Sequence, residues 1–350
     1  MEKAKRSGSF RKLLTGEREL SGQEKGVLIA LCLFLCLALA LLIFITILVR
    51  PPQRFSGKDG DGAVSVTEQT DPSTGESYRV EVPLSQRDGF YNILICGVDQ
   101  DKMRTDTMII ARLNTKDHST ALVSVPRDTL CRENTSVKAP KLNSLYAYGG
   151  LRKAGMEYLT DQLETMFNFH VDGYMLIDLE GFAAVIDLIG GVDFDVAQDM
   201  DYDDPSQELH IHLKAGQQHL DGDQARQLCR FRGYPMADID RCGVQQDFLR
   251  AASEQFFDSL GFSKLQKLTK LFNEFVITDL SVGNLIFFGR ELINCDLEKT
   301  ETATLPGYGA DVYGASYWIL DPEGTLDIIN DLVNPYDRDM SLSDMNLRTE

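Results

Sequence analysis

The chain has 350 residues and a formal net charge of −18, from 53 acidic and 35 basic residues. This excess of negative charge makes nucleic acid a poor partner, because phosphate backbones are bound by basic surfaces. The length allows one domain with a full hydrophobic core and additional terminal segments.

The N-terminal region predicts a membrane anchor. Residues 27–49 (VLIALCLFLCLALALLIFITILV) form an uncharged apolar run that is long enough to cross a bilayer as a helix. Basic residues precede this run, and no small-residue cleavage site follows it. The positive-inside rule then places residues 1–25 in the cytoplasm as a basic tail, and everything after the anchor outside. We therefore expect a single-pass cell-membrane protein with a signal anchor at 26–49.

Three segments follow the anchor. Residues 50–88 are rich in Gly, Ser, Asp, Glu and Pro, which is typical of a linker. Residues 89–336 carry the regular hydrophobic patterns and are expected to form a single domain. Residues 337–350 are polar and are expected to be a disordered tail.

The predicted elements of the domain alternate between strands and helices. In chain order we expect strands at 91–98, 107–114 and 121–126, with a hairpin turn at 116–119. A helix at 151–169, a strand at 173–179 and a helix at 180–189 follow. Two short strands at 192–196 and 209–213 precede a helix at 222–230, for which Asp221 is the expected N-cap. Helices at 242–260, 263–275 and 282–293, a strand at 315–320 and a helix at 322–332 complete the series. This alternation predicts the α/β class.

The cysteines and histidines give weaker signals. Five of the seven cysteines follow the apolar run, so at least one of these is a free thiol. Cys96 lies in a predicted strand and is expected to be a core residue. No Cys/His spacing suggests zinc, and His210 and His212, which alternate on a short strand, are expected to face solvent.

The loop between the first two strands gathers charged residues where apolar strands end. It contains Asp99, Asp101, Arg104 and Asp106. Ligands of open α/β sheets bind at such an edge, and Mg²⁺ prefers one or two protein carboxylates together with phosphate oxygens. A metal site at Asp99 and Asp106 is one interpretation. An ordinary solvated turn, in which aspartate is common, is the other.

Three further clusters could hold phosphate. Arg127 follows a strand end, where it could point into a cleft or form a surface ion pair with Asp128. Lys141 begins the segment KLNSLYAYGG, which could contact phosphate or be an ordinary loop. The last cluster is Arg230, Arg232, Arg241 and Gln245. The guanidinium groups of Arg230 and Arg232 match pyrophosphate oxygens bidentately, and Arg241 and Gln245 share one face at a helix start, where anions are favoured. The alternative is surface charge that balances the acidic domain.

Together these segments resemble the LytR–CpsA–Psr (LCP) family of membrane-anchored cell-wall enzymes. The resemblance covers about residues 89–336 and rests on NILICGVD, RTDTMIIARLN, VSVPRDT, KLNSLYAYGG, VDGYMLIDLEGFAAVIDLIGGVDFDV, LDGDQARQLCRFR and DIDRCGVQQ. It implies an extracellular α/β sandwich with a central mixed sheet and an apolar cavity for a polyprenyl tail. It also implies a phosphotransferase that moves a teichoic acid or capsular polysaccharide from an undecaprenyl-pyrophosphate carrier to peptidoglycan.

The resemblance also implies roles for individual residues. Asp99 and Asp106 match magnesium-linked aspartates, with Arg104 and Arg127 beside them in the catalytic set. The implied pyrophosphate-binding residues are Arg104, Arg127, Lys141, Arg230, Arg232, Arg241 and Gln245. A membrane-anchored pyrophosphatase and a non-catalytic polymer-binding or regulatory protein remain alternatives.

Overall fold

The computed structural model describes residues 49–52, 64–70, 77–131, 140–205, 209–236, 238–259 and 262–349. The expected basic tail at 1–25 and nearly all of the expected anchor at 26–49 lie outside these ranges. Among the helices in the described ranges, none is both long and apolar enough to cross a membrane.

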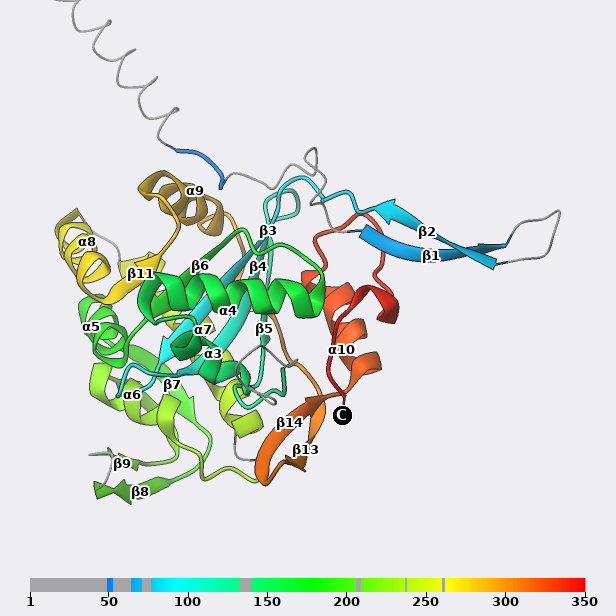
Figure 1. Ribbon diagram of the computed structural model, residues 1–350. Helices are drawn as coiled ribbons and strands as arrows, with labels where there is room; N and C mark the ends of the chain where they lie inside the picture. The colour runs from blue at the N-terminus through cyan, green and yellow to red at the C-terminus, as the bar shows by residue number, and fades with distance from the viewer. Residues whose placement is uncertain are drawn as a thin grey trace, which may run out of the picture.

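Six strands form a central mixed sheet in the order β11-β6-β3-β4-β5-β12 (Figure 1). Their bounds are β3 Phe90–Val98, β4 Thr105–Asn114, β5 Ser119–Ser124, β6 Gly173–Ile177, β11 Val276–Thr278 and β12 Glu301–Thr304. Strand β3 pairs parallel with β6 and antiparallel with β4, so it occupies the middle of the sheet. Its nearly continuous apolar sequence fits this place, because a central strand is covered on both faces.

The two faces of the sheet bury different side chains of β3, since successive residues of a strand point to opposite sides. Leu94 and Cys96 enter the main core, together with residues of α3 (Leu142–Tyr148) and α4 (Arg152–Phe167). Ile93 instead packs with Phe287 and Phe288 of α9 (Val282–Leu292). Because its side chains point alternately to the two faces, β3 packs against two separate layers of helices.

A second core lies beside the sheet and supports one end of it. It consists of the antiparallel pairs β7 (Val192–Val196) with β10 (Gly216–Leu220) and β8 (Met200–Asp204) with β9 (Leu209–Leu213), covered by three helices. These helices are α5 (Leu179–Ile189), α6 (Gly222–Arg230) and α7 (Asp238–Ser259). Helix α6 begins where the sequence predicts, because Asp221 caps it and Gln224 completes a capping box.

The remaining elements surround these two cores. They are the hairpins β1 (Val64–Thr70) with β2 (Ser77–Pro83) and β13 (Gly307–Val312) with β14 (Ala315–Leu320), the helices α8 (Phe262–Phe275) and α10 (Pro322–Ile328), the 3₁₀ turns η3 (Leu297–Lys299) and η5 (Leu342–Asp344), and the π-helical turn η4 (Ile329–Val333). The predicted helix at 322–332 thus ends as a π turn. Cys96 is buried, as expected, and all five cysteines after the apolar run are free thiols.

Two expectations about the ends of the domain are wrong. Within the expected linker, β1 and β2 form an antiparallel hairpin, which their alternating sequences VSVTEQT and SYRVEVP favour. The tail expected to be disordered is ordered over residues 337–349. Met340 is buried in the main core, and the amide of Asn346 donates a hydrogen bond to the carbonyl of Met166. The domain therefore extends beyond residue 336.

Candidate active site

A cavity of about 880 Å³ lies at the carboxyl end of β3 and the start of β4. One part of its wall is apolar and comes from the sheet and from the second core, with Ile95, Ile109, Phe182, Phe248 and Leu249. Another part is highly charged, with Asp99, Asp101, Arg104, Asp106, Arg127, Arg230, Arg232 and Arg241. The cavity therefore suits a molecule with an apolar portion and an anionic portion.

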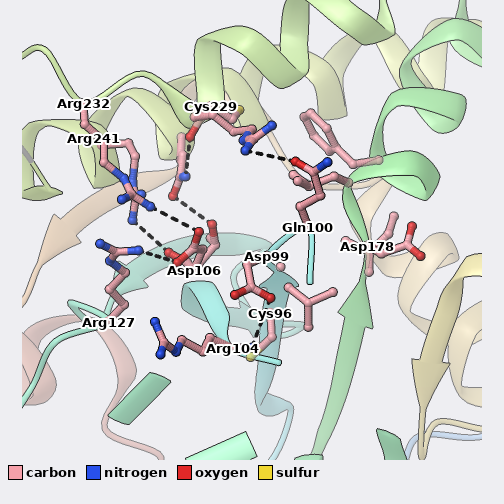
Figure 2. Close-up of a pocket in the computed structure, with 18 of the residues that line it drawn as sticks. Cys96, Asp99, Gln100, Arg104, Asp106, Arg127, Asp178, Cys229, Arg232 and Arg241 are labelled. Atoms are coloured by element: carbon pink, nitrogen blue, oxygen red, sulfur yellow. Dashed lines mark hydrogen bonds and ion pairs between the residues drawn. The ribbon is translucent and has the colours of Figure 1, made fainter. Parts of the chain in front are cut away.

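The β3–β4 loop folds back on itself and presents Asp99 to the cavity (Figure 2). The Oδ1 atom of Asp99 accepts hydrogen bonds from the backbone amides of Met103 and Arg104 at 2.9 and 3.1 Å. The backbone amide of Asp99 donates in turn to the carbonyl of Arg104 at 2.9 Å. These bonds fix one carboxylate oxygen and leave Oδ2 as the oxygen that can contact a ligand.

Asp106 is the centre of the charged wall (Figure 2). Its Oδ1 atom lies 2.5 Å from Nη1 of Arg127, and its Oδ2 atom lies 3.2 Å from Nη2 of Arg232. Its backbone carbonyl accepts a hydrogen bond from Arg241 at 2.9 Å. Burial by itself would raise the pKa of Asp106, but the positive charges of Arg127, Arg232 and Arg241 outweigh burial and lower this pKa. Asp106 is therefore held ionised and is a weak base.

The first turn of α7 provides two residues, Asp238 and Arg241, that hold this cluster in place. The side chain of Arg241 is 1% exposed, and its Nη2 atom lies 2.7 Å from Oδ1 of Asp238. The same Asp238 oxygen lies 3.3 Å from Nε of Arg127. The Nε atoms of Arg127 and Arg241 are buried and have no hydrogen-bond partner among the described residues. The arginines therefore have more donor capacity than the neighbouring carboxylates use.

Arg230 and Arg232 reach the cavity from the end of α6. The residue between them, Phe231, has an extended backbone and a buried side chain, so the two arginines flank it and both line the cavity. Burial lowers the pKa of Arg232, and the charges of Arg127 and Arg241 lower it further. A bound anion would relieve this repulsion, so the site favours a ligand with several negative charges.

Gln245 connects the two sides of the cavity without a charge. Its side-chain amide donates to the carbonyl of Cys229 at 2.9 Å, and its Oε1 accepts from the hydroxyl of Thr107 at 3.1 Å. Helix α7 is thereby joined both to α6 and to the residue that follows Asp106. This contact predicts a positioning function for Gln245.

The structure brings together every sequence-predicted site residue except Lys141. The Nζ atom of Lys141 lies 3.1 Å from Asp128 and 5.2 Å from the centre of the Tyr317 ring, and Lys141 does not line the cavity. From the sequence, Asp128 was considered as a surface partner of Arg127. In the structure Asp128 also forms an ion pair with Lys141, so this lysine is not directed toward a phosphate in the cavity.

Three residues of the site were assigned no role from the sequence, although Asp238 was noted beside Arg241. Asp238 joins two arginines, Thr107 holds Gln245, and Gln100 accepts a hydrogen bond from Arg230 at 3.4 Å. The position of Asp238 three residues before Arg241 is a signal that could have been used, because residues i and i+3 of a helix share a face. The other two depend on contacts between distant segments.

The sequence is similar to several named proteins. A Bacillus cereus protein named polyisoprenyl-teichoic acid–peptidoglycan teichoic acid transferase TagU is 29% identical over 247 residues, which are 69% of this chain and 77% of that protein. A Bacillus anthracis protein of the same name is 28% identical over 272 residues, which are 76% of this chain and 83% of that protein.

Solved structures share the fold. The Streptococcus agalactiae protein gbs0355 has a TM-score of 0.63 at 21% identity, over 74% of this chain and 92% of its own. Bacillus subtilis TagV has a TM-score of 0.58 at 23% identity, over 69% of this chain and 95% of its own. A structure described as TagT bound to LIIa-WTA has a TM-score of 0.58 at 20% identity, over 72% of this chain and 92% of its own.

The sequence model of one family, LytR_cpsA_psr, matches residues 60–333, which include the central sheet, the second core and the whole charged wall of the cavity. The match covers more than half of the chain, and the protein therefore belongs to the LytR_cpsA_psr family.

Proposed function

We propose that this protein is a phosphotransferase that moves an anionic glycopolymer from a polyprenyl-pyrophosphate carrier to peptidoglycan. One observation supports this most directly: one cavity is lined by five arginines, three of which contact Asp106, and by an apolar wall beside them. A lipid pyrophosphate has an anionic group that needs the arginines and a hydrocarbon tail that needs the apolar wall. The names of the Bacillus relatives, which specify polyisoprenyl-linked teichoic acid as donor and peptidoglycan as acceptor, support the same class of substrates.

The arginines bind and neutralise the pyrophosphate. Arg230 and Arg232 enter from α6, Arg127 and Arg241 lie around Asp106, and Arg104 comes from the β3–β4 loop. Guanidinium groups that are already held by carboxylates need little reorganisation when charge develops on phosphate oxygens. Asp106 and Asp238 therefore keep the donors in place, and the apolar wall receives the start of the polyprenyl tail.

The residues present also fit a magnesium ion, which we propose as the cofactor. Asp99 offers one carboxylate oxygen outside its loop hydrogen bonds, and Asp101 lines the same part of the cavity. The carboxylate of Asp106 already contacts Arg127 and Arg232, so it would join the ion only by releasing one of them. Bound Mg²⁺ would supply further neutralisation of the phosphate oxygens.

The reaction replaces the phosphoanhydride bond of the pyrophosphate by a phosphodiester bond to peptidoglycan. An oxygen of an acceptor hydroxyl on peptidoglycan attacks the phosphorus that carries the glycopolymer, and the bond from this phosphorus to the bridging oxygen breaks. Polyprenyl phosphate leaves with that oxygen, and the proton of the hydroxyl is released to water. The lowered pKa of Asp106 makes it a poor acceptor for this proton. We therefore assign Asp106 to holding the arginines and Asp99 to orienting the cation and the hydroxyl.

We also propose that residues 26–49 anchor the protein in the cell membrane, with residues 1–25 in the cytoplasm and the domain outside. The position of the first described residues supports this. Val49 packs against the cluster that contains Phe287 and Phe288, and the carbonyl of Arg50 accepts a hydrogen bond from Asn284 at 2.9 Å. The apolar run therefore leads directly to the surface of the domain at α9.

The test uses the full-length protein in detergent with a synthetic polyprenyl-pyrophosphate glycopolymer and peptidoglycan fragments, with Mg²⁺ or with EDTA. Magnesium-dependent joining of polymer to peptidoglycan, with release of polyprenyl phosphate, supports the proposal. Release of the lipid phosphate without joining would favour a pyrophosphatase, and binding without turnover would favour a carrier.

A matched pair of variants tests the cation site. Asp99→Asn keeps an oxygen for the loop amides but removes the charge, and we expect it to abolish the response to Mg²⁺. Asp117→Asn makes the same change in the β4–β5 turn, where Asp117 Oδ1 accepts from the amide of Ser119 at 3.0 Å. This control should behave like wild type. An Asp99→Asn variant with a normal magnesium response would refute the assignment.

A further inference from the structure

The β8–β9 hairpin lies at the edge of the second core (Figure 1), and its outer face carries a ladder of aspartate and histidine side chains. Asp201 lies opposite His212, and Asp203 lies opposite His210, in the antiparallel register. All four side chains are more than half exposed. Lys214, which lies 2.9 Å from Asp199, extends the ladder beyond the last pair.

Three of these residues converge on one point. The Oδ1 atom of Asp203 lies 2.5 Å from Nδ1 of His210 and 3.4 Å from Nε2 of His212. One ligand atom from each of the three residues lies within 4.8 Å of the other two. Ligands in a tetrahedral zinc site are about 3.3 Å apart, as bonds of 2.0–2.1 Å require. The side chains therefore need to move by only about an ångström to surround an ion.

The fourth residue orients one of the ligands. Asp201 accepts a hydrogen bond from Nδ1 of His212 at 2.8 Å, which directs the opposite nitrogen, Nε2, toward Asp203. Histidines that bind metals commonly donate their second ring nitrogen to a carboxylate, because this fixes the tautomer and the ring orientation. A simple surface ion pair does not require this arrangement.

We propose that Asp203, His210 and His212 form a Zn²⁺ site that is separate from the phosphotransfer centre, with Asp201 orienting His212. Two imidazoles and one carboxylate suit zinc and disfavour magnesium or calcium, which prefer oxygen ligands. This site goes beyond the proposed function and does not depend on it. The sequence did not indicate this site, because the two histidines are separated by a single residue and the carboxylates come from another strand.

The location of the hairpin suggests what the ion would do. On the inner face, Ile211 and Leu213 are buried in the second core, while Tyr202 and Leu209 line the cavity. An ion bound on the outer face would join β8 to β9 and restrict the motion of both strands. We infer that Zn²⁺ stabilises one wall of the cavity without contacting the substrate.

The experiment measures zinc binding directly. Full-length protein in detergent is freed of metal with a chelator and titrated with ZnCl₂ by calorimetry, and Co²⁺ is added in parallel to record the absorption of a tetrahedral site. We expect one equivalent of Zn²⁺ per chain and a higher melting temperature with zinc. Binding should weaken in acid, because protons and zinc compete for the same imidazole nitrogens.

Variants decide whether this site is the one titrated. The double variant His210→Ala/His212→Ala and the single variant Asp203→Asn should lose the equivalent of zinc, the cobalt spectrum and the thermal shift. His219→Ala is a matched control, because His219 forms a cross-strand pair with Asp193 at 2.7 Å on the β7–β10 hairpin. It should bind like wild type. No saturable binding by wild type, or equal binding by the double variant, would overturn the proposal.

Discussion

Arg230 offers the sharpest test of the anion-binding wall, because the fold depends little on its side chain. Its side chain donates one long hydrogen bond of 3.4 Å to Gln100, and Arg230 lines the cavity at the end of α6. Arg230→Ala should therefore change the free energy of unfolding by less than about 0.5 kcal/mol. Its effect should appear in the reaction instead.

The expected loss of activity follows from its position. Removal of one preorganised donor to a developing oxyanion costs about 3–4 kcal/mol, and a partly exposed group belongs at or below the lower end of this range. We therefore expect a loss of about 2–3 kcal/mol, which corresponds to roughly a 30- to 160-fold decrease in kcat/KM. The assay measures transfer of labelled polymer to peptidoglycan, and thermal unfolding is measured on the same preparation.

Arg226→Ala is the matched control for this experiment. Arg226 lies one turn earlier on α6, forms an ion pair with Asp223 and does not line the cavity. It should retain wild-type transfer. The reasoning fails if Arg230→Ala has wild-type kcat/KM, or if Arg226→Ala loses as much activity as Arg230→Ala.

Three other predictions concern stability. Arg241→Met should lower the free energy of unfolding by about 1–3 kcal/mol, measured by urea denaturation, because Asp238 loses one of its two arginine partners and the carbonyl of Asp106 loses a donor; an unchanged free energy of unfolding would contradict this. A chain truncated after residue 337 should have a lower melting temperature, since it loses the buried side chain of Met340, and an unchanged value would show that the tail adds nothing. The hydrogen bond to Glu164 raises the pKa of His170. The stability gained is complete below about pH 6.5 and is lost as pH rises through the raised pKa. His170→Gln should therefore reduce the melting temperature more at pH 6 than at pH 9, and an equal reduction at both would refute the linkage.

Local signals in the sequence predicted much of the fold. Helix α6 has the expected bounds because its N-cap, Asp221, and its capping-box partner, Gln224, lie within four residues of each other. The ordered C-terminal segment was missed because its order depends on distant residues. The side chain of Asn330 donates a hydrogen bond to the carbonyl of Met340 and accepts one from its amide, and no local sequence pattern predicts these bonds.

The candidate site shows the same division. The carboxylates and arginines could be placed together because they lie at the ends of strands and helices, and these positions meet at one edge of the sheet. The direction of Lys141 could not be predicted, because Asp128 and the ring of Tyr317 on β14 determine it. Asp106 could be assigned to the site, but its three arginine contacts, which make it a weak base, became visible only in the structure.

The two halves of the charged wall come from parts of the chain that are far apart. The β3–β4 loop contributes Asp99 and the start of β4 contributes Asp106, whereas Arg232, which follows α6, and Arg241 of α7 come from the second core. A pyrophosphate that contacts both halves acts as a non-covalent cross-link between the two cores, because a ligand stabilises the state that binds it. Opening of the second core away from the sheet should then become rarer in the loaded protein. Slower hydrogen exchange of the α6 amides after addition of the lipid pyrophosphate would report this coupling, so substrate capture also makes the domain more rigid.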